Sequence, residues 1–289
     1  MDYESQTTQS IWEGVVPLLI SCPAQSTSFH ILARRCSYLP LILPKLKAYL
    51  CDGLKQDLNV DDTEIWFSAA NVPLKWHYPI GLLYDIYTVD SPSLPWNITM
   101  NCGNFPSSAL ITMDVEGTGP NTLRDHFMAM IKEVGATYPG RDLPVVVAYA
   151  DYMRNGSIVR VMALTTQDQT QLWESIVTGH HDQFWQVNTP LVATVTPKSI
   201  PMRVYTVSKT LSTESVFTVL QTLVSPKAKE DDAEIVVGDM GWQGSITLHG
   251  VKVPLDASLL WLSMHAAYSD GFLHFVVYPS EETAAAKWI

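Results

Sequence analysis

Short runs of apolar residues punctuate the chain, and the runs near its two ends follow one another in the same order. Each end shows a β-rich run, a Val-Pro-Leu tripeptide that leads into a helical run, and a closing β-rich run. Short runs of β-branched and aromatic residues bounded by turn residues are typical of strands. The matching parts are Ile65–Phe67 with Ser245–Leu248, Val72-Pro73-Leu74 with Val253-Pro254-Leu255, and Trp96–Met100 with Phe272–Tyr278. The repetition predicts one small domain that is present twice.

The first copy carries enough further pattern to predict its whole fold. Val15–Ile20 and Phe29–Ala33 are β-rich runs separated by a polar turn, which predicts a hairpin. Pro44 suits the first turn of a helix, and leucines at helical spacing surround it. These leucines are Leu43, Leu46, Leu50 and Leu54. The order β-β-α-β-α-β over residues 12–105 predicts a ubiquitin-like (β-grasp) domain, in which a curved sheet wraps one helix.

The second copy, over residues 200–280, is expected to be incomplete. Its first strand is Ile200–Val207, and a helix is predicted at Ser215–Leu223, before the acidic, lysine-bearing linker Pro226–Asp232. The stretch between Val207 and Ser215 is too short for a full hairpin return, so we expect one strand to be missing. The helical run Ser258–Ala266 then leads to the closing strand.

Residues 118–190, between the two copies, predict a helix-rich domain, and residues 1–11 form a polar N-terminal segment. Thr122 and Asp125 fit a capping box at the start of a helix. The apolar stripe of that helix is Leu123, Phe127, Met130, Ile131 and Val134. A second helix is predicted from Thr166 to Val177 with Gly179 as its stop, and Asp182–Asn188 predicts a short further turn. The predicted fold class is therefore α+β, with two ubiquitin-like domains flanking a helix-rich domain.

Composition and charge narrow the classes of function. The formal net charge is −11 and no run of basic residues is present, which argues against nucleic acid as a partner. The first ten residues lack the features of a secretion signal, and no apolar run approaches the length of a membrane span. Four scattered cysteines predict reduced, mostly buried thiols in a cytoplasmic protein. They are Cys22, Cys36, Cys51 and Cys102.

The sequence predicts no catalytic, cofactor-binding or metal site. No glycine-rich phosphate loop, nucleophile elbow or zinc-protease motif is present. His180-His181-Asp182 is the best metal-like cluster, but adjacent residues on a helix point apart. His77 lies between Trp76 and Tyr78 and is interpreted as a structural histidine. A hydrolase that uses His77 or His180 is the enzymatic alternative.

One lysine is isolated in a long stretch of the chain. Lys132 is the only lysine from Trp76 through Pro197. It lies nine residues after Leu123, and at 100° per residue this is half a turn away, so its ammonium group should face solvent opposite the apolar stripe. From the residues alone, it is interpreted as a solubilising cation near a helix C-terminus.

Several motifs, in the same order along nearly the whole chain, resemble those of the autophagy protein 5 family. The match is close over Ile65–Ile98, with the motifs PLKWHYPIGLLYDI and LPWNIT, the second of which ends at Thr99. The other motifs are His126-Phe127-Met128 with Lys132-Glu133, Gln171-Leu172-Trp173, Asp182-Gln183-Phe184-Trp185, Ile200–Tyr205, and Leu260-Trp261-Leu262 with Phe272-Leu273-His274. The family usually continues Lys-Glu directly into Ala-Asp. Here Val134–Tyr149 separates Lys132-Glu133 from Ala150-Asp151, so this chain carries an insertion over residues 134–149.

The resemblance implies a non-catalytic scaffold of autophagosome formation. It implies that Lys132 is the acceptor of an isopeptide bond with autophagy protein 12, and that the conjugate binds autophagy protein 16, a coiled-coil protein, as a helix in a groove. The complex would act like a ubiquitin ligase and promote the lipidation of autophagy protein 8. It would be cytoplasmic and peripheral on the preautophagosomal membrane, without a cofactor.

A second function is left open by the residues of the first domain. Lys45, Lys47 and Lys55 lie along one predicted helix and could attach the chain directly to an anionic phospholipid membrane. The alternative is a core helix with a solvated basic edge. Salt-sensitive binding to liposomes would distinguish the two interpretations.

Overall fold

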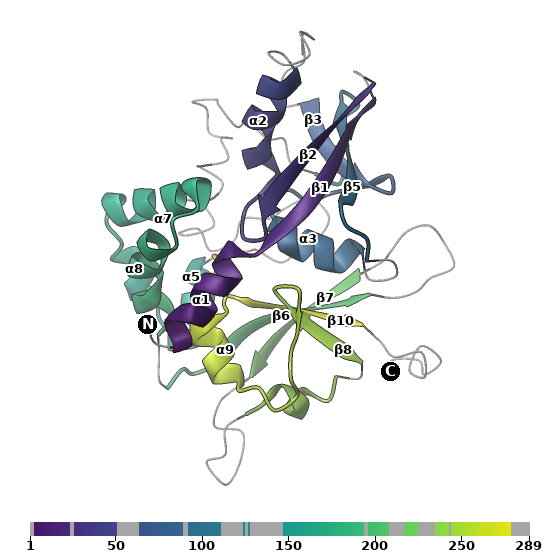
Figure 1. Ribbon diagram of the computed structural model, residues 1–289. Helices are drawn as coiled ribbons and strands as arrows, with labels where there is room; N and C mark the ends of the chain where they lie inside the picture. Colours follow the sequence, from purple (N-terminus) through teal and green to yellow (C-terminus); the bar gives the residue numbers. More distant parts are fainter. Residues whose placement is uncertain are drawn as a thin grey trace. The chain divides into compact units, whose positions relative to one another are not determined.

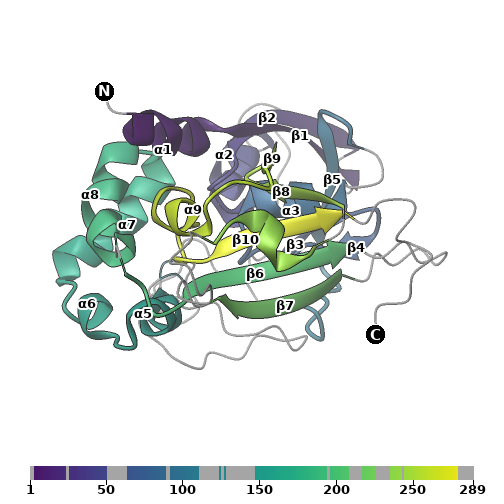
Figure 2. The same ribbon diagram turned by 90° about the horizontal axis from the view of Figure 1, so that it is seen from below.

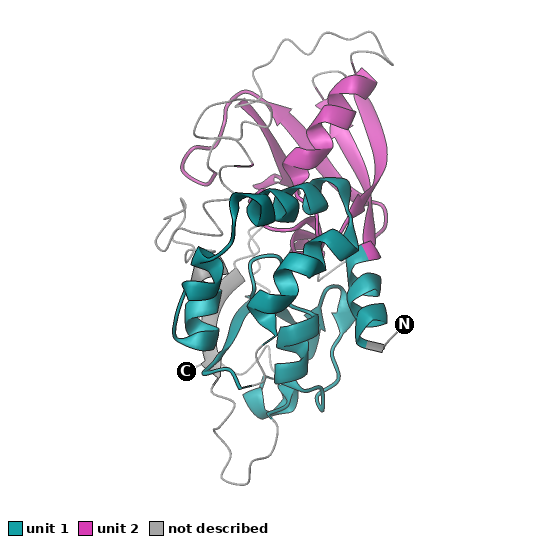
Figure 3. Cartoon of the chain, turned by 90° about the vertical axis from the view of Figure 1, so that its left-hand side faces the viewer, with its two compact units in different colours: residues 1–12, 130–136, 143–289 teal, residues 13–129, 137–142 magenta. Residues whose placement is uncertain are grey.

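The computed structural model describes residues 3–23, 26–50, 64–88, 92–110, 147–193, 196–207, 217–224, 235–242 and 244–278, with Arg124 and Phe127. The chain divides into two compact units, coloured separately in Figure 3. One unit contains residues 13–129 and 137–142, and the other contains residues 1–12, 130–136 and 143–289. Across the described helices, none is long and apolar enough to cross a membrane.

The unit of residues 13–129 and 137–142 is built on a five-stranded sheet with the order β2-β1-β5-β3-β4. Figure 1 shows the β1–β2 hairpin of this sheet with β5 beside β1. Strands β1 and β2 form an antiparallel hairpin, and β1 pairs in parallel with β5. The strands are β1 (Val15–Cys22), β2 (Thr27–Arg34), β3 (Ile65–Ala69), β4 (Val72–Pro73) and β5 (Trp96–Cys102). The helical elements are η2 (Leu39–Ile42), α2 (Leu43–Ala48) and α3 (Ile80–Tyr87). The predicted hairpin and the predicted order of elements along the chain are confirmed, and the two-residue strand β4 was not predicted.

Alternation along β1 selects the face of this sheet that packs on the helices. Val16, Leu18, Ile20 and Cys22 are buried, whereas the residues between them are half-buried or exposed, because successive side chains of a strand point to opposite faces. Leucines of α2 and α3 complete this core; they are Leu43, Leu46, Leu82 and Leu83.

An ion pair fastens α3 beneath the hairpin. Arg35 Nη2 lies 2.5 Å from Asp85 Oδ2 and also donates a 3.1 Å hydrogen bond to the carbonyl oxygen of Gly81. A Cβ atom at position 81 would lie 2.7 Å from the Cβ of Arg35. The absence of a side chain at Gly81 therefore permits the close approach on which the ion pair depends.

The other unit repeats the same sheet. Its strand order β7-β6-β10-β8-β9 matches the first sheet strand for strand, with β6 parallel to β10. The strands are β6 (Ile200–Val207), β7 (Phe217–Val224), β8 (Ser245–Leu248), β9 (Val251–Lys252) and β10 (Leu273–Tyr278), with η5 (Val237–Met240) and helix α9 (Leu259–His265). The predicted duplication and the predicted helix at Ser258–Ala266 are confirmed.

The predicted helix at Ser215–Leu223 is wrong. Residues of this segment form β7, which pairs with β6 from Val207↔Phe217 to Ile200↔Val224. Half of the residues of β7, FTVLQTLV, are β-branched, and such residues favour a pleated strand over a helix. The second copy is therefore not trimmed, and its hairpin is complete.

Five further helices of the described residues complete this unit. They are α1 (Tyr3–Glu13), α5 (Val147–Asn155), α6 (Val159–Met162), α7 (Thr166–Thr178) and α8 (His181–Val192). The N-terminal end of α7 is fixed by a capping box between Thr165 and Asp168, and its C-terminal end by Gly179 in the left-handed region at φ 78°. The predicted second helix and its stop are thus confirmed. Helix α8 is longer than the predicted short turn at Asp182–Asn188, and α1 was not predicted.

Candidate functional site

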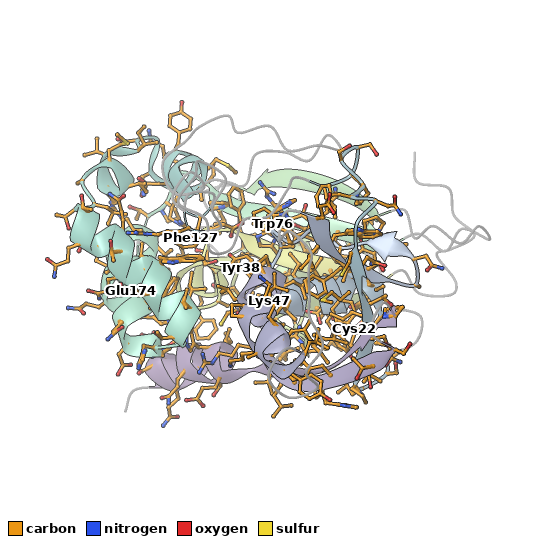
Figure 4. All side chains as sticks on the ribbon, turned by 90° about the horizontal axis from the view of Figure 1, so that it is seen from above. Cys22, Tyr38, Lys47, Trp76, Phe127 and Glu174 are labelled. Atoms are coloured by element: carbon orange, nitrogen blue, oxygen red, sulfur yellow. The ribbon has the colours of Figure 1, made fainter. Side chains whose placement is uncertain are left out.

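The predicted acceptor, Lys132, lies outside the described residues, as do Glu133 and residues 134–146 of the insertion. The helix predicted after Thr122 is described only at Arg124, which is exposed, and Phe127, which is buried (Figure 4). The described chain resumes with α5, which begins inside the predicted insertion and carries Ala150-Asp151. The candidate site is therefore built from α5 and from the residues that hold it.

Helix α5 is anchored on the second sheet by an apolar contact. Ala150, Met153 and Phe272 form one buried cluster, and Ala150 and Phe272 are fully inaccessible to solvent. Gly271, next to Phe272, has φ +79°, and a Cβ atom there would lie 3.1 Å from the Cβ of Ala150. The backbone of this turn and the helix therefore touch at a position that only glycine fits without strain.

The buried guanidinium group of Arg154 also holds α5 on the second sheet. Arg154, of which 2% is exposed, donates a hydrogen bond of 2.9 Å from Nη2 to the carbonyl oxygen of Gly271. The backbone of Lys198 donates a 2.7 Å hydrogen bond to the carbonyl oxygen of Arg154. Burial lowers the pKa of Arg154 to about 10, partly offset by the nearby charge of Asp151. Asp151 is itself buried and accepts a 2.6 Å hydrogen bond from Asn155.

A second polar network involves residues on either side of Phe272 in the chain and a tyrosine of β6. His274 contacts Asp270 Oδ2 through Nε2 and the Tyr205 hydroxyl through Nδ1, each at 2.8 Å. The guanidinium of Arg203 stands 4.7 Å from the centre of the Phe272 ring. Burial by itself would raise the pKa of Asp270, but the charges of His274 and Arg203 and the N–H groups that it accepts from hold that pKa below its ordinary value. The turn that receives α5 is therefore held by hydrogen bonds of buried polar side chains.

Helix α1 docks on α8 through one tryptophan. Trp12 is 5% exposed, its ring centre lies 4.7 Å from that of Phe184, and its Nε1 donates a 3.0 Å hydrogen bond to the carbonyl oxygen of Gly179. His181 adds a 3.1 Å contact from Nε2 to the hydroxyl of Thr8. Figure 2 shows α1 alongside α8. These contacts place the N-terminal segment in the unit that contains the helices and the second sheet.

The histidines considered for chemistry have structural surroundings. His77 is 5% exposed and contacts the rings of Trp76 and Tyr78. His180 contacts the hydroxyl of Thr178, whereas His181 contacts Asp182 and Thr8. Within the described ranges, no group of three metal-ligating side chains is placed to hold an ion.

A shallow groove runs between α7 and α8. Its lining consists of four glutamines, two threonines and Glu174, which Figure 4 labels on α7. Gln171 spans it by donating to the carbonyl oxygen of Gln183 and to Gln186 Oε1. An amphipathic partner helix buries an apolar face, so this polar groove does not suit the predicted coiled-coil partner.

The basic helix of the first domain has its apolar side inside the core. Leu43 and Leu46 of α2 are buried, whereas Lys45 is exposed and Lys47 is half-exposed. Lys55 lies outside the described residues. Direct attachment to a membrane therefore stays a prediction that depends on the lysines and not on an available apolar face.

Two ubiquitin-like sheets and a helical region define the class of this protein, an α+β protein with two ubiquitin-like domains. Three family models match in order: the UblA domain of autophagy protein ATG5 at residues 11–102, its alpha-helical bundle region at 150–194, and its UblB domain at 199–277. The chain belongs to the autophagy protein 5 family, which gives it a role in autophagy. The predicted fold class and family are confirmed.

Relatives with this description match almost from end to end. Autophagy protein 5 of Drosophila melanogaster is 29% identical, over 96% of this chain and 98% of its own length. Autophagy protein 5 of Phaeosphaeria nodorum is 29% identical, over 94% and 96%. The crystal structure of Kluyveromyces marxianus Atg5 matches with a TM-score of 0.71 at 23% identity, over 94% of this chain and 99% of that one, which supports the fold.

Sequence reasoning found the acceptor candidate but missed the anchor of α5. Arg154, Asp270 and His274 come from segments more than a hundred residues apart, and no local pattern connects them. The Tyr-Ser-Asp-Gly turn before the last strand is a usable signal, because a glycine there predicts a left-handed position.

Proposed function

We propose that this protein is a non-catalytic scaffold of autophagosome formation that is conjugated through Lys132 to autophagy protein 12. The observation that carries the proposal is the ordered match of all three domains to the autophagy protein 5 family. The conjugate binds the coiled-coil autophagy protein 16 and promotes lipidation of autophagy protein 8. The protein acts in the cytoplasm and peripherally on the preautophagosomal membrane.

The isolation of Lys132 supports its assignment. It is the only lysine in the chain from Trp76 through Pro197, so the segment offers one amine to the conjugating enzyme. A lysine amine attacks a thioester only when it is deprotonated and accessible. The approaching enzyme supplies the proton acceptor and the geometry, so the scaffold needs no catalytic side chain of its own.

The contacts that anchor α5 also support the assignment of Lys132 as the acceptor. Lys132 precedes α5 in the chain, and α5 is fixed by the buried Arg154 and by Phe272. Fixing one end of the acceptor segment lowers the entropy that is lost when the segment enters an enzyme active site. The proposal therefore assigns a positioning role to α5.

Reconstitution with the modifier and its activating and conjugating enzymes tests the proposal. The wild-type chain is expected to gain a band of higher mass, and Lys132→Arg is expected to abolish it while leaving the charge and the stability nearly unchanged. Lys45→Arg, at an exposed position of α2, is the matched control and should conjugate fully. A full yield of conjugate from Lys132→Arg would show that another lysine is the acceptor.

A further inference from the structure

Strand β2 forms an outer edge of the first sheet and lacks the features that normally protect such an edge. It has eight residues, its pairing with β1 is continuous from Cys22↔Thr27 to Val15↔Arg34, and it contains no proline, glycine or lysine. Edge strands are usually shortened, bulged or interrupted by lysine or proline, because their free backbone groups otherwise pair with another chain. The opposite edge strand, β4, has only two residues.

The register identifies which backbone groups of β2 point outward. Arg35 donates a 2.8 Å hydrogen bond to the carbonyl oxygen of Gly14, in line with the β1–β2 ladder. Hydrogen-bonded pairs alternate along an antiparallel ladder, so the odd-numbered residues of β2 bond to β1. The N–H and C=O groups of Ser28, His30 and Leu32 therefore face away from β1. Among the described strands none pairs with them, and all three residues are exposed.

Apolar side chains remain accessible beside this edge. Phe29 and Ile31, on the face that packs toward the helices, are only half-buried, and the ring of Phe29 lies 4.9 Å from that of Tyr49, just after α2. On the other face, 67% of Leu32 is exposed. An added strand would place alternate side chains on these two faces.

The surroundings of the edge are basic in an acidic protein. From Gly14 through Cys51 the chain contains no Asp or Glu, although its overall formal charge is −11. Arg35 is neutralised by Asp85. Lys45 and Lys47 on α2 and Arg34 at the end of β2 are the other basic residues of this stretch; Lys47 is labelled in Figure 4. A positive patch favours a partner of opposite charge.

We propose that the outer edge of β2 binds an extended acidic peptide segment of a partner protein as an additional strand. The backbone of the peptide pairs with Ser28, His30 and Leu32, its apolar side chains lie beside Phe29 and Ile31, and its acidic residues face α2. This mode of recognition takes affinity from the main chain and specificity from alternate side chains. A lipid surface could use the lysines but has no backbone to pair with the strand, so the geometry favours a peptide.

A fluorescein-labelled peptide in which three aspartates precede valine–isoleucine–valine–isoleucine is the probe. Fluorescence anisotropy with the full chain is expected to show saturable binding. The same peptide with alternate backbone nitrogens methylated, or with lysines in place of the aspartates, is expected to bind at least about fivefold more weakly, because each loses one of the two recognition elements. Equal binding of the methylated peptide would overturn the proposal.

Two variant pairs separate backbone pairing from charge. His30→Pro removes an outward N–H group that β1 does not use and is expected to weaken binding at least about fivefold relative to His30→Ala. Lys45→Glu combined with Lys47→Glu is expected to weaken binding and reduce its salt dependence, whereas Lys252→Glu, exposed on β9, should change neither. Identical affinities within each pair would contradict the proposal. Circular dichroism checks that each variant is folded.

Amide hydrogen exchange supplies a signature that no other binding mode produces. The peptide is expected to slow exchange at Ser28, His30 and Leu32, and to leave Phe29 and Ile31, already bonded to β1, unchanged. Vesicles of phosphatidylcholine with phosphatidylserine are the comparison. Binding to these vesicles without binding to the peptide would assign the basic patch to membranes and would refute the peptide site.

Discussion

Arg154 and Gly271, 117 residues apart, are joined by a 2.9 Å hydrogen bond from the buried guanidinium to the backbone carbonyl oxygen. This bond connects α5, the first described helix after Lys132, to the turn before the last strand of the second sheet. Arg154→Ala would remove the positive charge near the buried Asp151 and leave the carbonyl group of Gly271 without its donor. We expect a loss of about 3 kcal/mol in the free energy of unfolding, measured by urea denaturation. Arg160→Ala, at an exposed position, should cost less than about 1 kcal/mol.

The close contact between Gly271 and Ala150 can be measured with a double-mutant cycle. Gly271→Ala is expected to cost about 1–3 kcal/mol, because alanine is strained at φ +79° and its Cβ would lie 3.1 Å from that of Ala150. Ala150→Gly in the same chain should relieve the steric part but not the strain. The two substitutions are therefore expected to be less destabilising together than the sum of their single effects. Strict additivity would show that the turn moves away from the helix.

Low pH is expected to decrease the free energy of unfolding of the unit that contains the second sheet, because Asp270 becomes protonated. The pKa of Asp270 is lowered in the folded protein, so the folded state binds fewer protons than the unfolded state as the ordinary pKa of about 3.9 is approached. The stability from this group is present above that pKa and is lost as the pH falls through the lower, folded value. Urea denaturation between pH 7 and pH 3 should show the decline, and Asp270→Asn should flatten it while lowering the stability at pH 7. A decline of equal size in Asp270→Asn would assign the acid sensitivity to other groups.

Trp12 is expected to control the docking of α1. Trp12→Ala removes the ring contact with Phe184 and the hydrogen bond to Gly179, and such truncations of buried tryptophan cost about 3–5 kcal/mol when the surrounding structure cannot relax. Because these contacts join α1 to α8 and its N-terminal turn, α1 should detach before the sheet unfolds. Hydrogen exchange should therefore rise throughout Tyr3–Glu13 and stay unchanged in β10. Glu4→Gln, which alters the half-exposed contact with His265, is the control and should leave α1 protected.

Two thiols are expected to be poorly reactive in the folded protein. Burial raises the pKa of Cys22 to about 11, with a smaller contribution from the charge of Cys102, and burial also raises the pKa of Cys36 to about 11. Since the thiolate is the nucleophile, alkylation by iodoacetamide at pH 7.5 should be about a hundredfold slower than in urea. Peptide mass spectrometry measures each site. Rapid alkylation of the native chain would show that these segments open.

Local sequence patterns were sufficient to predict the secondary structure of segments that bury one regular face. The β-rich run Val15–Ile20 predicted β1, and the helical run Thr166–Val177 with its stop at Gly179 predicted α7. The pattern failed in β7, because short apolar runs fit either a strand or a helix and the pairing with β6 decided between them. It also failed for α1, whose polar sequence gives little signal until Trp12 meets α8.

The sequence by itself determined the duplicated sheet, the helical region between the copies, the family, and Lys132 as the acceptor candidate. These follow from β-rich runs, from apolar residues at helical spacing and from ordered motifs, all of which can be read in the sequence before the fold is known. Only the tertiary structure decided that β7 is a strand, that α5 is held by the turn at Gly271, and that β2 is an edge strand whose outer side pairs with no described strand. Those features depend on partners far away in the sequence, because a hydrogen bond or a buried charge is satisfied by whichever group the fold brings to it.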